Sequence, residues 1–262
     1  AETLARVVGA DDDAARYLGL TVTDMTELIL ARQKANPLRI RTTSSAERIQ
    51  KIHRLATAVE QREEELKRAI YADLRKSESE VVLSELYPVN AEIKQVRHHL
   101  KKWMRPKRVA APLALMGSRN HVHYVPKGVV LIVSPWNYPF MLTLAPLISA
   151  IAAGNCAVVK PSELCPATAD FVSRLVAGVF DDNEVAFLQG GPELARFLVS
   201  QPFDHIFFTG GPRIGRSVMA AAANHLTSVT LELGGKSPVW IDESADLREA
   251  GEEGIHLFAS GA

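Results

Sequence analysis

Four short segments carry residue types that could do chemistry, and each follows an apolar run. They are Ser134–Pro139, Lys160–Glu163, Thr209–Gly215 and Glu232–Gly235. In the first segment two prolines form a rigid turn around Trp136 and Asn137, so the Asn137 amide could donate a hydrogen bond to a developing oxyanion. The alternative is that Asn137 is a turn residue capping the helix that follows.

The second and third segments are suited to a nucleotide. Lys160 at a strand end can hold ribose hydroxyls or phosphate, and Glu163 can accept a hydrogen bond from a ribose 2′-hydroxyl, which disfavours a 2′-phosphate. In the third segment the glycines let the backbone approach a pyrophosphate, and the helix beginning near Arg213 offers its N–H groups. The glycine spacing is not the standard GxGxxG. Either segment could also be a surface turn without a ligand.

Glu232 in the fourth segment lies between two leucines at a strand end. Desolvation in such a semi-apolar setting makes a carboxylate more basic, which suits a general base. The alternative is a structural ion pair with a neighbouring lysine. The following Gly235-Lys236-Ser237 is not a phosphate-binding P-loop, because that motif needs a glycine at position 230, where the chain has threonine.

Short apolar runs alternate with helix-length segments around these sites. The expected strands are Val129–Val133, Cys156–Val159, Val185–Leu188, His205–Phe208 and Val229–Leu231. The expected helices are Leu142–Ala153, Ala167–Val179, Glu193–Val199 and Ile214–Asn224. This alternation predicts an α/β fold with a Rossmann-like parallel sheet and helices on both faces. Such sheets bind ligands at the carboxyl ends of their strands, where the four segments lie.

Two long amphipathic helices are expected before the sheet. Apolar residues recur at three- and four-residue steps from Ser45 to Arg75, and Ser44 with Glu47 fits a capping box at the start of that helix. A second helix is expected from about Ser79 to Trp103. Residues 1–44 are polar and mixed and are expected to form an N-terminal extension.

Composition excludes several classes of protein. The 262 residues include 30 Lys+Arg, 30 Asp+Glu, 47% hydrophobic residues and two cysteines, which excludes a disordered chain and a disulfide framework. Basic residues gather between Lys94 and Arg108, but without a nucleic-acid motif we interpret them as a solvated helix face and expect no nucleic-acid partner. His121 and His123 lack a third metal ligand. No apolar run reaches about 18 residues, so we expect no membrane association and a cytoplasmic location.

The four segments, in this order and at these intervals, resemble the aldehyde dehydrogenase superfamily. The resemblance covers roughly Ser45 to Gly261. Further segments resemble the class 3 and coniferyl aldehyde dehydrogenase subgroup: Asp73–Lys76, Trp103 with Pro106, and Pro126–Val130. The resemblance implies that residues 45–262 form an NAD(P)-binding domain and that residues 118–126 belong to an oligomerisation arm.

The resemblance also assigns roles to individual residues. Asn137 would stabilise the tetrahedral oxyanion, and Glu232 would activate water for thioester hydrolysis. The cofactor would be NAD, with NADP possible. Its contacts would come from Ser134, Trp136, Lys160, Ser162, Glu163, Gly190, Thr209, Gly210, Gly211, Ile214, Gly215 and Leu233. Gly211 and Pro212 depart from the commoner form of the glycine turn.

One part of the implied chemistry has no counterpart in the sequence. The superfamily's nucleophilic cysteine follows the glutamate after one helix, whereas Cys156 and Cys165 lie near Lys160. We therefore expect the catalytic domain to be absent from this chain and the chain alone to be inactive. The full-length parent, expected as a homodimer, would oxidise an aldehyde, aromatic or fatty, to a carboxylic acid through a cysteine thiohemiacetal. The alternatives are a truncated nucleotide-binding pseudoenzyme with a regulatory role and a structural partner with an empty glycine turn.

Overall fold

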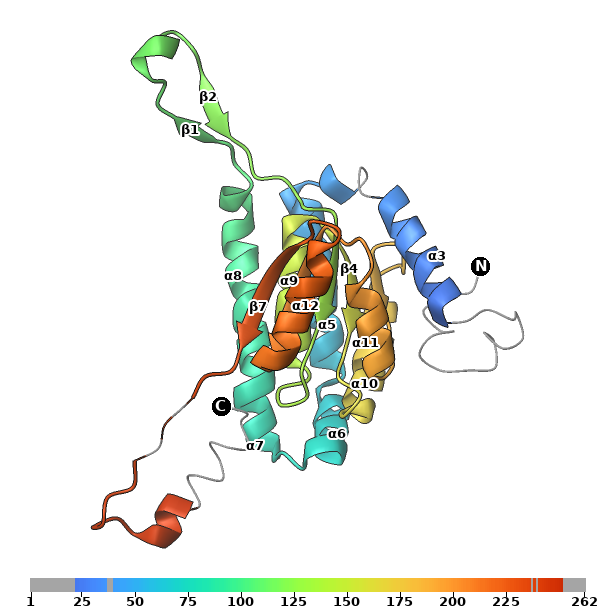
Figure 1. Cartoon of the computed structure of the whole chain (residues 1–262), viewed down its shortest axis with the longest axis vertical. Coiled ribbons are helices and arrows are strands. Elements are labelled where there is room, and N and C mark those ends of the chain that lie inside the picture. The colour runs from blue at the N-terminus through green and yellow to red at the C-terminus, as the bar shows by residue number, and fades with distance from the viewer. Residues whose placement is uncertain (1–21, 37–39, 237, 239, 252–262) are drawn as a thin grey trace.

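A parallel sheet of five strands forms the centre of the computed structural model, which describes residues 22–36, 40–236, 238 and 240–251 (Figure 1). The strands are β3 (Val129–Val133), β4 (Cys156–Lys160), β5 (Val185–Phe187), β6 (His205–Gly210) and β7 (Ser228–Leu233). Their order is β5-β4-β3-β6-β7. The chain thus builds outward from β3 on one side and then on the other, which places a topological switch point between β3 and β6. The expected strands and the α/β class are confirmed.

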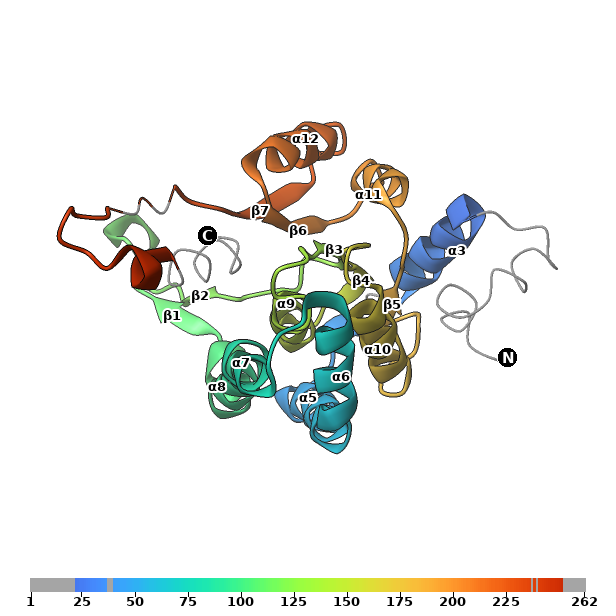
Figure 2. The same cartoon turned by 90° about the horizontal axis from the view of Figure 1, so that it is seen from below.

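Helices cover both faces of this sheet. The helices that connect its strands are α9 (Met141–Ala153), α10 (Pro166–Ala177), α11 (Pro192–Val199) and α12 (Pro212–Ala223). Figure 2 shows α11 and α12 on one side of the sheet and α9 and α10 on the other. Side chains of β3 alternate accordingly, with Leu131 in the apolar cluster under α11 and α12 and Ile132 in the cluster under α9 and α10.

The expected helix from Ser45 to Arg75 is two helices, α5 (Ser45–Gln61) and α6 (Glu63–Leu74). The capping box of Ser44 and Glu47 is present at the start of α5. The backbone leaves helical geometry at Arg62, where φ is −121°. The Arg62 guanidinium lies 5.0 Å from the centre of the Phe171 ring of α10 and pairs with Glu65. After this break, α6 packs along α10.

The second long helix spans the predicted range but is not uniform. It consists of α7 (Glu78–Val81), a π-helical turn η1 (Val82–Leu86) and α8 (Tyr87–Trp103). The sequence pattern did not predict the π-helical turn. Among the described residues, none of these or the other helices is long and apolar enough to cross a lipid bilayer.

The described part of the expected N-terminal extension packs against the sheet. It forms α3 (Val22–Ala35), and Ile29 and Leu30 of this helix join the apolar cluster that contains Leu131 of β3. The buried Gln33 amide donates hydrogen bonds to the carbonyls of Ala157 and Asp182. Residues 22–35 are therefore packed against the sheet, and the predicted domain boundary after residue 44 stays a prediction.

A hairpin projects from the top of the molecule in Figure 1. It pairs β1 (Lys107–Val109) with β2 (Asn120–Val122) in antiparallel fashion and carries a short 3-10 helix, η2 (Leu113–Leu115), at its tip. The tip side chains of Leu113 and Met116 are exposed. This hairpin includes part of the range predicted as an oligomerisation arm, and that role stays a prediction.

Candidate functional site

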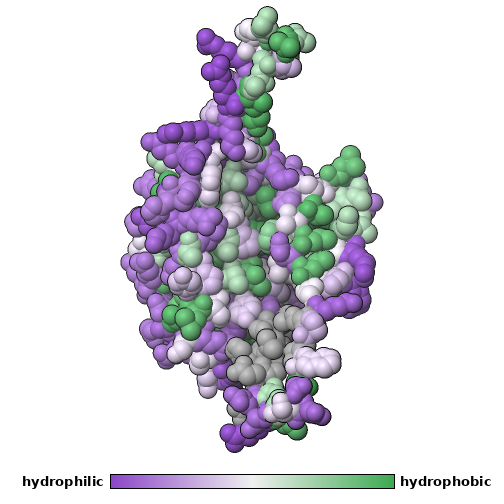
Figure 3. All heavy atoms as spheres, turned by 90° about the vertical axis from the view of Figure 1, so that its left-hand side faces the viewer, coloured by the Kyte–Doolittle hydropathy of each residue, from purple (hydrophilic) through white to green (hydrophobic). Residues whose placement is uncertain are grey.

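A groove of about 1280 Å³ runs along the sheet face that borders α8 and α9. Figure 3 faces this side of the molecule, where apolar side chains gather below the hairpin between hydrophilic flanks. At the carboxyl ends of the strands the groove is lined by several of the predicted site residues: Trp136, Asn137, Thr209, Gly210, Gly211, Glu232 and Leu233. The remaining predicted residues do not line it: Ser134, Lys160, Ser162, Glu163, Gly190, Ile214 and Gly215.

Asn137 lies in the tight turn between β3 and α9, at the wall of the groove. The turn begins with a hydrogen bond from the Ser134 N–H to the Lys160 carbonyl, 3.1 Å long. It ends with the buried Thr143 hydroxyl donating to the Pro139 carbonyl at 2.6 Å. Trp136 is 42% exposed, so its ring borders the groove and the solvent. The predicted rigid turn is therefore present, with Asn137 at a position where its side chain can meet a ligand.

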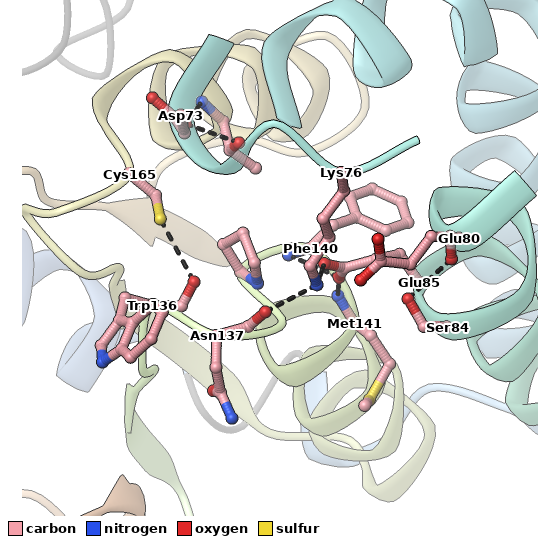
Figure 4. Close-up of polar contacts among 12 residues, drawn as sticks. Asp73, Lys76, Glu80, Ser84, Glu85, Trp136, Asn137, Phe140, Met141 and Cys165 are labelled. Carbon is pink, nitrogen blue, oxygen red and sulfur yellow. Dashed lines mark hydrogen bonds and ion pairs between the residues drawn. The ribbon is translucent and has the colours of Figure 1, made fainter. Parts of the chain in front are cut away.

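The back of this turn is held by two side chains, Lys76 and Glu85, to which the sequence analysis assigned no role in the site (Figure 4). Lys76 Nζ donates to the Asn137 carbonyl at 2.6 Å and to Glu85 Oε1 at 2.9 Å. Glu85 Oε2 accepts the backbone N–H groups of Phe140 and Met141, at 3.2 and 2.9 Å. Burial raises the pKa of Glu85 against the opposing effects of Lys76 and these N–H donors. The missed signal was a glutamate among the buried apolar positions of a helix.

Lys160 and Glu163 form an ion pair at the end of β4. Their Nζ and Oε2 atoms are 2.6 Å apart, and the Lys160 side chain is almost fully buried. Burial alone would raise the pKa of Glu163, but the hydrogen bond and charge of Lys160 outweigh it and hold this pKa below its ordinary value. Ser162 Oγ accepts the Leu164 N–H at 3.3 Å. Lys160 and Glu163, the two residues predicted to contact one ribose, thus lie side by side as the two partners of an ion pair.

The glycine turn after β6 leads directly into α12. Gly211 is the N-cap and has no side chain to cap the helix, so the first N–H groups of α12, including that of Ile214, have no partner within the helix. A Cβ on Gly210 would approach the Phe208 ring to 2.7 Å, and one on Gly215 would approach Leu233 to 2.9 Å. A Cβ on Gly211 would instead enter open space. The turn thus offers N–H groups beside free volume, which suits an anion.

Three buried polar atoms at the same edge of the sheet have no hydrogen-bond partner among the described residues. They are Ser134 Oγ after β3, Gln189 Nε2 after β5 and Thr209 Oγ1 at the end of β6. Gly190 follows Gln189 and lies against Leu194, which a Cβ would approach to 2.6 Å. Buried polar groups in proteins are normally satisfied, so this set indicates a place for a polar ligand.

Glu232 differs from the prediction. Its side chain is exposed, and it makes no ion pair with a described residue. The expected semi-apolar setting is not seen, because neighbouring residues on a strand point to opposite faces and Leu231 and Leu233 do not cover Glu232. The role of Glu232 as a general base stays a prediction. Glu232 nevertheless lines the same groove as Asn137. It lies in β7, which is separated by β6 from the strand that precedes Asn137. The alternative, a structural ion pair of Glu232 with a neighbouring lysine, is not seen among the described residues.

Neither cysteine is suited to nucleophilic attack. Both are buried; Cys156 begins β4, and Cys165 is the N-cap of α10. Burial raises the pKa of Cys156 to about 11 and that of Cys165 to about 12. Both are therefore thiols at neutral pH, whereas the reactive form is the thiolate. Within the described ranges, no group of at least three His, Cys, Asp or Glu residues is arranged to hold a metal ion.

Comparisons with known proteins agree with this geometry. The family model described as "Aldehyde dehydrogenase family" matches residues 10–261. Aldehyde dehydrogenase family 3 member A2 of Pongo abelii is 44% identical over 82% of this chain and 43% of its own length. The probable coniferyl aldehyde dehydrogenase of Caulobacter vibrioides is 42% identical over 85% of this chain and 47% of its own length.

Solved structures show the same architecture. The substrate-bound state of Staphylococcus aureus AldH has a TM-score of 0.80 and 40% identity, covering 87% of this chain and 50% of that one. Mycobacterium tuberculosis aldehyde dehydrogenase complexed with NAD+ has a TM-score of 0.76 and 25% identity, and the match covers 87% of this chain and 47% of that one. The chain thus spans about half the length of the relatives that it matches. The match to nearly the whole chain, together with the identity to class 3 and coniferyl-type enzymes, shows that this chain belongs to the aldehyde dehydrogenase family.

Proposed function

We propose that this chain forms the cofactor-binding part of an NAD(P)-dependent aldehyde dehydrogenase that oxidises an aromatic or fatty aldehyde to the carboxylic acid. The observation that carries the proposal is the convergence of Asn137, the Thr209–Gly211 turn and Glu232 on one groove. These groups come from the carboxyl ends of β3, β6 and β7, which are neighbours in the sheet. Ligands of open parallel sheets bind at this position.

The residues at this edge fit a dinucleotide. The Gly211 backbone faces open space beside the N-terminus of α12, which suits a pyrophosphate. The Ser134 and Thr209 hydroxyls and the Gln189 amide, which lack hydrogen-bond partners among the described residues, would provide polar contacts. Lys160 and Glu163 would hold ribose hydroxyls from the end of β4. When bound, NAD supplies the hydride acceptor for aldehyde oxidation.

Asn137 and Glu232 would act on the substrate side of the groove. The Asn137 amide would donate to the oxyanion that forms when a nucleophile adds to the aldehyde carbonyl. Glu232 would take a proton from the water that releases the acid. The nucleophile, which would form the thiohemiacetal, is assigned to a cysteine outside these 262 residues, since Cys156 and Cys165 are buried thiols.

Two further parts of the proposal concern assembly and location. The β1–β2 hairpin would help the full-length enzyme to form a homodimer, because it projects from the domain and exposes apolar residues at its tip. We also propose a cytoplasmic location, because both cysteines are free thiols and low cysteine usage is typical of reducing compartments.

Calorimetric titration of the 262-residue chain with NAD and with NADP tests the cofactor site. We expect NAD to bind at least several-fold more tightly, because the Glu163 carboxylate disfavours a 2′-phosphate. Replacing this carboxylate, Glu163→Ala, should bring the two affinities together. The matched control is Glu64→Ala, which removes an exposed carboxylate of α6 that pairs with Lys67 and not with Lys160, and it should preserve the NAD preference. Binding of neither cofactor by the wild-type chain would refute the proposed site.

Turnover separates the enzyme from the pseudoenzyme alternative. The full-length protein should reduce NAD in the presence of an aromatic or fatty aldehyde. Binding of NAD without turnover of either aldehyde class would favour the nucleotide-binding pseudoenzyme instead.

A further inference from the structure

The Asn137 turn is fixed from behind by a buried ion pair that belongs to another part of the chain. Lys76 Nζ reaches the carbonyl of Asn137 itself, and Glu85 accepts the two N–H groups where the turn passes into α9. The Lys76 ammonium also lies 4.0 Å from the centre of the Tyr138 ring. Consecutive parts of the turn are thereby tied to one charge pair (Figure 4).

Local backbone features direct both side chains inward. Arg75, which caps α6, adopts φ = 60°, a left-handed conformation that is uncommon for a residue with a side chain. Lys76 follows Arg75, and its side chain is buried. Glu85 lies in the π-helical turn η1, a local widening of the helix that is frequent at functional sites. Both unusual conformations thus occur beside the two residues that hold the Asn137 turn.

Stability alone is a poor reason for this arrangement. The Glu85 side chain is fully buried and that of Lys76 is 8% exposed, so both charges have lost most of their hydration. Replacing a buried ion pair by apolar residues of similar volume is often neutral or stabilising. What an apolar pair could not do is hold the Asn137 carbonyl and the Phe140 and Met141 N–H groups at fixed points. The hydrogen bonds that the pair makes therefore identify its role.

We propose that Lys76 and Glu85 are positioning residues that set the orientation of Asn137 toward the groove. The proposal rests on the proposed function, in which Asn137 stabilises the oxyanion. Lys76 fixes the peptide on the carboxyl side of Asn137, and Glu85 fixes the start of α9, which leaves the Asn137 side chain to meet the substrate from an already ordered backbone. A misplacement of about 1 Å in such a group can reduce the rate by roughly 100-fold.

Hydrogen exchange of the 262-residue chain tests the positioning without any need for catalysis. Lys76→Met keeps the unbranched shape and most of the length of the side chain but removes its charge and its hydrogen bonds. We expect amide exchange in residues 136–141 to become at least about tenfold faster, with the β3 amides unchanged. The matched control is Lys51→Met, which removes the ion pair between Lys51 of α5 and Glu184 and should not affect the Asn137 turn. Unchanged exchange in the turn of Lys76→Met, or equal acceleration in both variants, would overturn the proposal.

A second variant keeps the test valid if Lys76→Met does not fold. Glu85→Gln preserves the shape of the side chain but replaces the carboxylate by a neutral amide, which removes the ion pair with Lys76 and weakens the acceptor for the Phe140 and Met141 N–H groups. We expect exchange to accelerate several-fold in the turn only. Exchange identical to that of the wild type in this variant would equally contradict the assigned role.

Kinetics of the full-length enzyme then separate positioning from a general effect on folding. In Lys76→Met we expect kcat per folded enzyme to fall roughly 10- to 100-fold while KM for NAD stays within about twofold. Lys76→Arg, which restores the charge and donors, should recover most of the lost kcat. An unchanged kcat per folded enzyme would overturn the proposal. If Asn137→Ala itself left kcat unchanged, the proposed function would fail. The exchange result would still show whether the clamp, meaning the Lys76–Glu85 pair, holds the Asn137 turn.

Discussion

The two parts of the candidate site differ in how firmly the chain itself holds their backbone, although Ser134 Oγ in the first part also lacks a hydrogen-bond partner among the described residues. The turn after β3 is closed on its back side, where Cys165, Lys76 and Glu85 bind backbone groups of Trp136 through Met141. The region at the ends of β6 and β7 is open. There Thr209 Oγ1 is buried without a partner among the described residues, and Glu232 is exposed in the groove.

With the proposed function, this difference distinguishes a part that is already organised from a part that the cofactor would complete. Preorganised donors stabilise a transition state because they need no reorganisation when charge develops. A turn that presents Asn137 benefits from such rigidity. A dinucleotide site gains more from N–H groups and hydroxyls that are left without internal partners, because the ligand then supplies the missing hydrogen bonds. We therefore expect substitutions in the two regions to have opposite signatures in stability and in binding.

The largest expected effect is on catalysis by the full-length enzyme. Asn137→Ala removes the proposed oxyanion donor from the closed turn and should lower kcat by about 10²- to 10³-fold, the range found when a single oxyanion donor is removed. Steady-state kinetics measure this loss, and NAD titration should show little change. The matched control is Asn90→Ala, an exposed position of α8 that should retain wild-type rates. A kcat for Asn137→Ala within threefold of the wild type would show that the turn does not serve the oxyanion.

A pair of glycine substitutions tests the open region. Gly210→Ala places a Cβ about 2.7 Å from the Phe208 ring, which is packed in the core and cannot shift freely. We expect it to lower the free energy of unfolding by about 1–3 kcal/mol in urea denaturation. Gly211→Ala meets nothing within 4 Å and should change this free energy by less than about 1 kcal/mol. Its NAD affinity should nevertheless fall by about tenfold or more, because the methyl group occupies the space assigned to the pyrophosphate. Wild-type affinity in Gly211→Ala would place the cofactor elsewhere.

Sequence patterns predicted the framework better than the surroundings of the site. Continuous apolar runs identify buried parallel strands, and residues that follow them must lie at one edge of the sheet, so Asn137 and Glu232 were brought to the same groove as expected. The break at Arg62 was not predicted, because no proline or glycine marks it and it depends on packing against α10. Burial of a side chain likewise depends on neighbours in space.

The clamp on the Asn137 turn illustrates why such surroundings escape a sequence pattern. Lys76 and Asn137 are 61 residues apart, and Glu85 and Phe140 are 55 apart. Only the fold brings them together. The one local signal was Glu85, a charged residue between the buried Val81 and Val89 of an otherwise apolar helix face. A carboxylate in such a position needs a partner, and its partner could not be named before the path of the chain was known.

The smallest expected effect contrasts the two regions through the same substitution. Thr143 Oγ1 donates to the Pro139 carbonyl in the closed turn, so Thr143→Val leaves that buried carbonyl without this donor and should lower the free energy of unfolding by about 1–2 kcal/mol. Thr209 Oγ1 has no partner among the described residues, so Thr209→Val removes an unsatisfied hydroxyl and should raise that free energy by up to about 1 kcal/mol.

Urea denaturation of the two variants measures these changes in the free energy of unfolding. NAD titration measures how each substitution changes the affinity for the cofactor. Thr209→Val should bind NAD several-fold more weakly, because the hydroxyl is the group that the ligand would satisfy, whereas Thr143→Val should bind it as the wild type does. Destabilisation by both substitutions would mean that the Thr209 hydroxyl is already satisfied inside the protein. The open region would then be as closed as the Asn137 turn, and the contrast between preorganised and ligand-completed parts of the site would not hold.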